Sequence, residues 1–402
     1  MKNRQILLVS YFFEPLQTVA AERWARFCAG LKKRGLDLHV LAGPWKSGDT
    51  DSSRDIEYLD DPVSEDSGKY KTGFAPTSGF RSTMRKLIPL FLLIDGKWFW
   101  SLRVFLKVIQ RRHSTSVLIV TGTPWSSVVA AALAARVSSL PYIVDFRDLW
   151  ATEPFLRSQS ALARRYFAWL ERWVVRGAMS ILTVNDPLTQ YFQNLDTTKK
   201  VVCIPNGFSG ELHYNEVTFN SMATAQTHLL YGGSISGHSG VAEFLKAFDL
   251  AQVPVDLAFM GTDFLGVLPH PHAAHIPQVS GREAEMEMAR AGVLLLTLHR
   301  KSVHYVTGKL MSYLKAGRPI LYWGPLESPA AKIVRECGVG WVIANDDLEG
   351  LKRALTEINE RFHDRHSFAF APNLTQIREY SVDRMVERIE REVRLSFGIR
   401  RN

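Results

Sequence analysis

The sequence predicts an α/β protein made of two doubly wound, Rossmann-like domains. Its 402 residues suffice for two domains of about 100–200 residues each. Short, continuous apolar segments alternate with helical segments, which is typical of parallel sheets covered by helices on both faces. The polar stretch 219–226 interrupts this alternation, and we expect a linker there. In such folds ligands bind at the carboxyl ends of the strands, so we expect the ligands in a cleft that the two domains face.

The first half of the chain supplies one complete set of strands and helices. We predict strands at 5–10, 36–41, 117–121, 142–146, 181–184 and 201–204. We predict helices at 19–34, from Pro124 to Ser138 with Thr123 as N-cap, at 162–176, and after an Asp186-Pro187 cap. Glycines at 35 and 177 suit the ends of two of these helices. Residues 44–80 are rich in Asp, Ser, Gly and Lys, and we expect loops there.

The second half repeats the pattern. We predict strands at 229–231, 255–260, 293–298, 320–323 and 341–344, with helices beginning near Ser239, Arg282, Thr307, Ser328 and Asp346. A last helix at 382–395 carries an apolar face of Met385, Val386, Ile389 and Val393. The predicted domains are 1–218 and 225–378, followed by the last helix at 380–397.

Composition limits the compartment and the partners. The three cysteines are far apart and form no pair, which favours a reducing compartment and argues against a zinc site. The apolar start ends at Glu14-Pro15 without a cleavage site, and the longest apolar run, 87–94, is too short to span a bilayer. We therefore expect a cytoplasmic protein. The net charge of +9 favours nucleic acid, anionic lipid or phosphorylated ligands, and no nucleic-acid motif accompanies it.

Two segments of the second half could bind an anion. The predicted strand at 229–231 runs into Gly232 and Gly233, where backbone N–H groups could approach a phosphate, although a plain tight turn is the alternative. Lys309 lies in the first turn of a predicted helix, where the helix dipole disfavours a cation unless an anion is near. A solvated surface lysine is the alternative.

Two segments of the first half also carry chemistry. Charged residues at 145–148 directly follow a predicted strand, either at a functional site or in a structural Arg–Asp network. Residues 81–112 mix basic residues with large apolar ones, which suits the surface of an anionic bilayer or a helical pair packed on the domain.

The motifs, taken together, resemble glycosyltransferase family 4 in its bacterial surface-polysaccharide branch. Residues 117–127 resemble the strand and TSPP-like loop of that branch, 142–150 its "aDFRDPW" segment, and 204–208 its "IPNGfD". Residues 307–321 resemble "tgKlfEYLaagkPIl", and Asp95 to Trp98 lies where that branch often has "D…gW". The match runs in order through almost the whole chain.

The resemblance implies a GT-B architecture and a metal-independent, retaining hexosyltransferase that uses a nucleotide-sugar and no cofactor. It implies an acceptor, expected to be lipid-linked, in the N-terminal domain and the nucleotide in the C-terminal domain, for polysaccharide biosynthesis. It also implies peripheral contact with the inner face of the cytoplasmic membrane through residues 81–112. Lys309, Asp148 and Arg147 are the expected catalytic residues. The expected donor-binding residues are Gly232, Gly233, Ser234, Arg282, His304, Thr307, Gly308, Lys309 and Ser312. Those on the acceptor side are Glu14, Arg23, Trp125, Asp145 and Trp150, with Arg23 a candidate for an acceptor phosphate.

The sequence departs from the family at two places. The family often carries Glu-x7-Glu, whose second glutamate holds the ribose hydroxyls, and here the positions are His304 and Ser312. A basic residue usually follows the glycines at 232–233, and here only His238 is available. Two alternatives therefore stay open: a non-catalytic partner subunit of a glycosyltransferase complex, and a GT-B sugar-nucleotide epimerase, which would need no acceptor.

Overall fold

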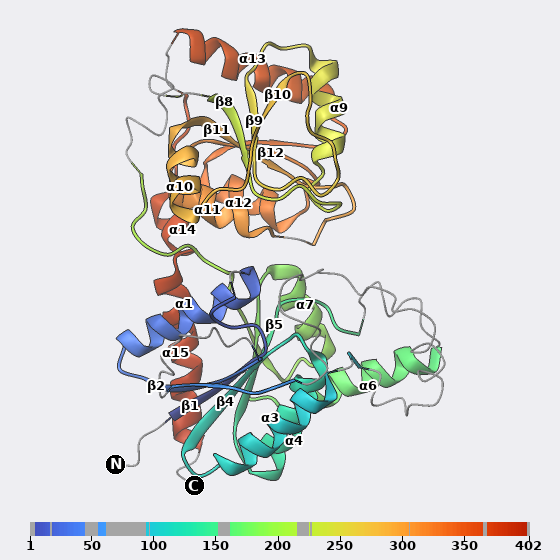
Figure 1. Cartoon of the computed structure of the whole chain (residues 1–402), viewed down its shortest axis with the longest axis vertical. Coiled ribbons are helices and arrows are strands. Elements are labelled where there is room, and N and C mark those ends of the chain that lie inside the picture. The colour runs from blue at the N-terminus through green and yellow to red at the C-terminus, as the bar shows by residue number, and fades with distance from the viewer. Residues whose placement is uncertain are drawn as a thin grey trace. The chain divides into compact units, whose positions relative to one another are not determined.

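The structure is a computed structural model of the whole chain. It describes residues 5–16, 18–44, 55–61, 94–95, 97–151, 161–214, 225, 227–304, 306–364 and 368–399. The chain forms two compact units, Met1–Pro205 with Met385–Asn402, and Asn206–Arg384. Figure 1 shows each unit as a twisted sheet with helices packed against it. No helix in the described part is long and apolar enough to cross a membrane.

The N-terminal unit is built on a seven-stranded sheet in the order β3-β2-β1-β4-β5-β6-β7, and each pair of neighbours runs parallel. The strands are β1 (Gln5–Ser10), β2 (Asp37–Ala42), β3 (Ile56–Tyr58), β4 (Thr115–Thr121), β5 (Tyr142–Phe146), β6 (Ser180–Thr183) and β7 (Lys200–Cys203). The helices are α1 (Val19–Lys33), α3 (Trp98–Gln110), α4 (Trp125–Val137), α6 (Ala161–Gly177) and α7 (Asp186–Leu195). From β1 the chain passes through α1 to β2, toward one edge of the sheet. From β4 it passes through α4 to β5, toward the opposite edge. Because such crossovers are right-handed, α1 covers one face and α4, α6 and α7 the other.

The C-terminal unit repeats this plan on a six-stranded parallel sheet in the order β10-β9-β8-β11-β12-β13. The strands are β8 (Thr227–Gly232), β9 (Leu257–Met260), β10 (Ala273–Ile276), β11 (Ala291–Thr297), β12 (Ile320–Trp323) and β13 (Gly340–Ile343). The helices are α9 (Val241–Ala251), α10 (Gly281–Arg290), α11 (Gly308–Ala316), α12 (Pro329–Cys337), α13 (Leu348–Asp364) and α14 (Leu374–Arg378).

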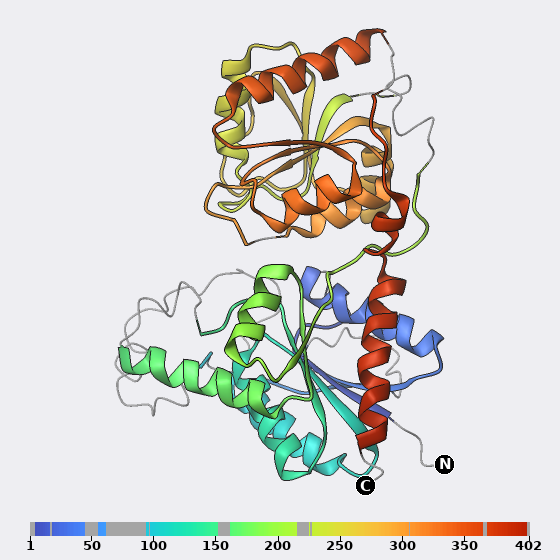
Figure 2. The ribbon, with the colours of Figure 1, turned by 180° about the vertical axis from the view of Figure 1, so that it is seen from behind.

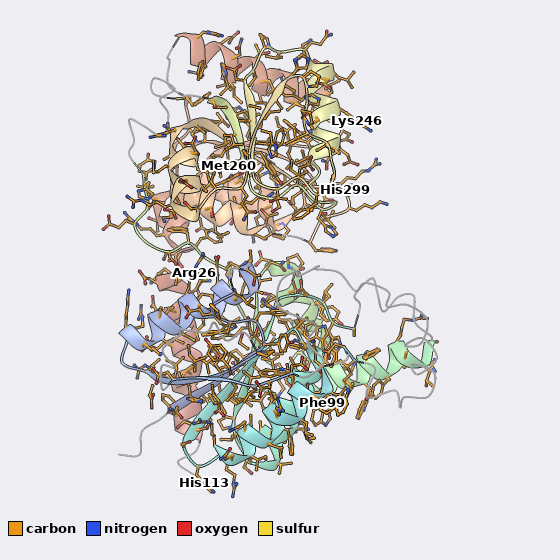
Figure 3. All side chains as sticks on the ribbon, in the orientation of Figure 1. Arg26, Phe99, His113, Lys246, Met260 and His299 are labelled. Atoms are coloured by element: carbon orange, nitrogen blue, oxygen red, sulfur yellow. The ribbon has the colours of Figure 1, made fainter. Side chains whose placement is uncertain are left out.

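Alternation along the strands divides the C-terminal core into two layers. Leu294 and Leu296 of β11 join the cluster under α10 to α12, whereas Val293 and Leu295 join the cluster under α9 and α13. Successive side chains of a strand point to opposite faces, so an apolar strand feeds both layers. Met260, labelled in Figure 3, lies at the end of β9 in the first of these clusters. Both predicted sheets, and with them the α/β fold class, are confirmed.

The last helix, α15 (Val382–Ile399), belongs to both units. From Met385 onward it packs against the N-terminal unit, with Met385, Val386, Ile389 and Val393 fully buried. Figure 2 shows it running alongside α1. The contact is close at Gly30, where an added Cβ would come within 2.5 Å of Val386 Cγ2.

The boundary between the units lies earlier than the sequence suggested. Phe208 donates its N–H to Tyr380 O at 3.0 Å and accepts from Val382 N at 2.9 Å, and His213 N bonds to Lys315 O at 3.0 Å. The chain after residue 206 is therefore already bonded into the C-terminal unit. Of the stretch 219–226 predicted as the linker, only residue 225 is described.

Two predicted caps lie one residue away from their expected place. The N-cap of α4 is Pro124, not Thr123, and α7 is capped by Asn185, whose side chain accepts from Leu188 N at 3.0 Å. The helix α4 thus has no capping side chain of its own. Asp95 replaces it from outside the helix, because Asp95 Oδ2 accepts from Ser126 N at 2.9 Å. A carboxylate at this end also complements the helix dipole.

Candidate functional site

The side chain of Lys309 lies over the end of strand β8. Its Nζ is 3.8 Å from the centre of the Tyr231 ring, donates to the Tyr231 hydroxyl, and donates to Ser234 O at 3.0 Å. Within the described residues no carboxylate pairs with this ammonium. The structure therefore brings Lys309 to the glycine loop, as a cation without a compensating anion.

Gly233 makes this approach possible. It has φ of +118°, and an added Cβ would lie 2.5 Å from Lys309 Cε. A side chain here would be strained and would displace the lysine. Ser312, one helical turn after Lys309, is exposed and points from the same side of α11.

The glycine N–H groups differ from the expectation. Gly232 N donates to the Tyr313 hydroxyl at 2.8 Å, and Gly233 N donates to Met260 O at 2.7 Å. Both donors are used inside the unit, so neither is available to a diphosphate. The glycines instead provide space for Lys309, while the N–H of Ser234 has no protein acceptor within the described ranges. Tyr313, which fixes the loop from α11, was not among the expected site residues.

Burial sets the protonation of this cluster. Desolvation lowers the pKa of Lys309 to about 7, and burial raises the pKa of Tyr231 above its ordinary value. A lysine in this condition is half charged near neutral pH and becomes fully charged when an anion is placed beside it.

The other predicted donor residues lie around the start of α10 and α11. Thr307 is the N-cap of α11, but its Oγ1 is buried and has no hydrogen-bond partner among the described residues. His304 is exposed just before α11, Gly308 is its first residue, and Arg282 is exposed in the first turn of α10. The start of α11 thus holds two groups that could bind an anion: the Thr307 hydroxyl, which has no partner among the described residues, and the Lys309 ammonium.

In the N-terminal unit the charged segment after β5 forms a buried network. Asp145 accepts from Arg23 Nη2 at 2.8 Å, Trp24 Nε1 at 2.8 Å and Thr121 Oγ1 at 3.0 Å, and both side chains of the Arg23–Asp145 pair are 0% exposed. Burial alone would raise the pKa of Asp145, but the charge and hydrogen bonds of Arg23 hold it below its ordinary value. The network joins α1 to the ends of β4 and β5.

Four of the residues expected on the acceptor side are buried. Arg23 and Asp145 neutralise each other inside the unit. Trp125 and Trp150 are buried and stacked, with ring centres 5.2 Å apart and planes 10° apart. These four side chains belong to the interior of the N-terminal unit, and their role toward an acceptor stays a prediction.

The accessible residues on this side are Glu14 and Asp148, which are exposed, and Arg147, which is partly buried. Arg147 Nε donates to Gly122 O at 2.8 Å and so holds the turn after β4. Asp148, beside it in the chain, is exposed as a residue, but desolvation of its carboxyl raises the pKa of that group above its ordinary value.

The fold and these two strand-end clusters define the class of the protein: two doubly wound units of the GT-B fold. Solved structures with this fold cover nearly the whole chain. They include HepE of Anabaena in complex with UDP and glucose (TM-score 0.60, 15% identity, 96% of this chain and 98% of that chain). They also include sucrose-phosphate synthase of Thermosynechococcus elongatus (TM-score 0.66, 12% identity, 98% and 100%). A third is α,α-trehalose 6-phosphate synthase of Burkholderia multivorans (TM-score 0.57, 14% identity, 99% and 99%).

The sequence of the N-terminal unit is similar to a known family. Residues 20–207 match the model of the glycosyl transferase 4-like domain family. No curated protein matches the chain significantly. Residues 20–207 are therefore similar to the glycosyl transferase 4-like domain family, and the chain as a whole has the GT-B fold.

Proposed function

We propose that the protein transfers a sugar, with retention of anomeric configuration, from a nucleotide-sugar to a lipid-linked saccharide acceptor in surface polysaccharide biosynthesis. The observation that carries the donor half is Lys309 at the start of α11, a desolvated ammonium that no carboxylate of the described residues pairs with. Such a group is costly to bury unless a ligand supplies the opposite charge. A nucleoside diphosphate would supply it.

The chemistry follows from where charge develops. As the bond between the anomeric carbon and the β-phosphate oxygen breaks, negative charge accumulates on that phosphate. Lys309, with the Thr307 hydroxyl and the Ser234 N–H, would stabilise this charge. The acceptor oxygen forms the new bond and loses a proton. On the acceptor side, Asp148 and Arg147 are the proposed contacts with the acceptor or the reacting sugar, and Glu14 is a further accessible candidate.

UDP is the first donor nucleotide to test, because HepE structures hold UDP and UDP-glucose. A ligand that binds only the folded state raises the apparent melting temperature. We expect one nucleoside diphosphate in a series to raise it and its sugar conjugate to release that diphosphate only when an acceptor is present. No shift with any nucleoside diphosphate would contradict the proposed function.

Two alternatives predict different results from the same samples. His304 and Ser312 replace the usual carboxylates, which supports a non-catalytic partner subunit; it would bind the nucleotide without turning it over. An epimerase would consume the nucleotide-sugar without any acceptor. Transfer that depends on the acceptor excludes both.

A further inference from the structure

Helix α6 carries a row of three arginines that form no ion pair within the described residues, although Glu171 and Asp196 lie near enough to interact with Arg172 and Arg176 through space. Arg165, Arg172 and Arg176 are exposed and spaced along one side of the helix, and Arg136 of α4 lies beside them. The one acid of α6, Glu171, is buried on the other side and accepts from Tyr191 Oη at 2.6 Å and Ala151 N at 3.1 Å. Within the described residues none of these four arginines has an ion-pair partner.

Aromatic rings lie between these charges. The Arg136 guanidinium is 4.1 Å from the centre of the Trp173 ring and donates to Trp173 O at 2.6 Å. With Trp169, these residues surround a depression of about 660 Å³ between α4 and α6. Its lining is Arg136, Arg165, Ala168, Trp169, Arg172, Trp173 and Arg176.

Exposed apolar residues continue the same surface. Trp169 is 57% exposed and Leu162, two turns before it on the same side of α6, is 70% exposed. On α4, Val137 is 66% and Leu133 44% exposed, next to Arg136. Figures 1 and 2 both show α6 projecting outward from the N-terminal unit. Large apolar side chains gathered on a projecting, basic surface indicate an interaction site.

The segment 81–112, which we expected to contact a membrane, has most of its described basic side chains paired with carboxylates, unlike the arginines named above. Residues 81–93 and 96 lie outside the described residues, so the structure does not test that part. Of its described cations, Lys97 pairs with Asp61 at 2.9 Å, and Lys107 and Arg111 both pair with Glu57, at 2.5 and 2.9 Å. These ion pairs remove most of the free positive charge from α3, whereas Arg136, Arg165, Arg172 and Arg176 form no ion pair within the described residues.

We propose that α4 and α6 form a docking surface for an anionic lipid bilayer, defined by Arg136, Arg165, Trp169, Arg172 and Arg176. Arginines would meet the phosphates, the indoles would lie at headgroup level, and Leu162 and Val137 would enter the acyl boundary. A second copy of this surface would repel it by like charge. A nucleic acid or an acidic protein would leave the exposed aliphatic residues without an apolar partner. The proposal does not depend on sugar transfer.

The test is sedimentation of the full chain with vesicles of phosphatidylcholine alone or mixed with phosphatidylglycerol. We expect binding only to the mixed vesicles, and weaker binding as salt rises. A basic side chain near an anionic surface strengthens binding about fivefold. The triple substitution Arg165→Ser, Arg172→Ser and Arg176→Ser should therefore weaken binding on the order of 100-fold, and Trp169→Ala should weaken it further.

A matched control removes the same charge from the C-terminal unit. Lys246 (labelled in Figure 3, pointing away from α9), Lys352 and Arg353 are exposed, and changing all three to Ser should leave vesicle binding nearly unchanged. Circular dichroism and nucleotide binding check that both triple variants fold. Equal binding to neutral vesicles, or equal losses in the two triples, would overturn the proposal. Binding to soluble polyglutamate but not to vesicles would also overturn it and indicate an acidic macromolecule.

Discussion

Lys309 is the residue on which the donor site depends, because it is the cation that α11 and the glycine loop hold together. Replacing it by Ala removes a preorganised positive charge from the leaving group, and turnover at saturating donor should fall about 10²–10³-fold. Lys309→Arg should recover only part of this, since a planar guanidinium does not reproduce a compact ammonium above Gly233.

The measurement is the rate of sugar transfer, with circular dichroism to confirm that each variant folds. A folded Lys309→Ala protein with near-normal turnover would remove Lys309 from the mechanism and leave His238 and Arg282 as the next candidates.

The lowered pKa of Lys309 predicts a pH dependence of nucleotide binding. In the free protein this pKa is about 7, and a bound diphosphate should raise it, so binding above pH 7 takes up a proton. Affinity should therefore fall by up to about tenfold per pH unit between about pH 7.5 and 9.5, where the phosphates are already ionised. Calorimetry in two buffers of different ionisation enthalpy measures the uptake directly.

The stability of the free protein should change in the opposite direction over this range. Because the folded pKa lies below the unfolded value of 10.5, the unfolded chain binds more protons, and the Lys309 contribution to stability rises with pH. Lys309→Arg stays charged and should show neither dependence. Affinity that stays constant with pH, without proton uptake, would contradict the protonation of Lys309 on binding.

Ser312 tests where the ribose lies. It points from the same side of α11 as Lys309, one turn further along, at the position of the family's second glutamate. Ser312→Glu should supply a charged acceptor for the ribose hydroxyls, and a hydrogen bond to a charged group contributes about 1.5–3 kcal/mol net. Calorimetry should show tighter nucleotide binding, with Ser312→Gln intermediate. Unchanged or weaker binding would mean that Ser312 does not face the ribose.

Arg23 and Asp145 have a structural role that can be measured. Arg23→Met leaves the Asp145 carboxylate buried without its cation, and breaking such a pair costs about 3–5 kcal/mol. Adding Asp145→Asn removes the second charge and keeps an acceptor for Trp24 Nε1, so the double variant should be the more stable of the two. Amide hydrogen exchange of β1, β4 and β5 measures the stability of the N-terminal unit separately from that of the C-terminal unit.

The acid dependence of this pair has a definite sign. The pKa of Asp145 is lowered by folding, so its contribution is complete above the unfolded value of 3.8 and is lost as pH falls through the folded value. The Arg23→Met protein should lack this loss. A single variant as stable as wild type would show that the pair contributes nothing to the fold.

At the scale of elements, the contact of α1 with α15 explains a glycine in the middle of a helix. Gly30 costs helix stability relative to Ala by about 1 kcal/mol, yet Gly30→Ala should destabilise the N-terminal unit, because the new Cβ would meet Val386. Adding Val386→Ala relieves the clash and should recover part of the loss. Exchange of the α15 amides measures both; a Gly30→Ala protein more stable than wild type would contradict the close contact.

Most of the strands that the sequence predicted are buried, although the edge strands β7 and β13 are only partly buried. A continuous apolar run in the sequence predicts a buried strand directly. One such run forms β11, in which every residue is buried. The edge strands β3 and β10 were missed, because their residues are half-buried or exposed and carry mixed polarity. Helices were predicted where glycine or proline marks an end, whereas α14 spans only five residues and offers no period to detect.

Sequence analysis could predict those residues of the candidate site whose role is visible in the neighbouring sequence. Lys309 stands out because a cation in a first helical turn opposes the dipole. The partners that determine how the site works were not predictable, because Tyr313 reaches Gly232 across 81 positions and Asp145 reaches Arg23 across 122. These pairings depend on how elements pack. For this reason the sequence did not show that the glycine N–H groups and the Arg23 guanidinium are bonded within their own units.

At the scale of the molecule, the two units share one plan and differ in what their strand ends hold. The strand ends of the N-terminal unit hold a neutralised ion pair and stacked indoles. Those of the C-terminal unit hold an ammonium that has no counter-charge in the part of the chain that the structure describes. The same sheet topology therefore supports a compensated floor in one unit and a site that lacks an anion in the other. A sequence search can detect the plan, but charge compensation depends on three-dimensional contacts.

The course of α15 also has a consequence for synthesis on the ribosome. The N-terminal unit is discontinuous, since residues 385–402 complete a core that residues 1–205 begin. Until those last residues leave the exit tunnel, the α1 surface around Gly30 stays uncovered, while residues 206–384 already form a contiguous unit. Domains of a growing chain generally fold in order from the N-terminus. Here the second unit can finish first, so a nascent chain would need protection of its first half until residues 385–402 have emerged.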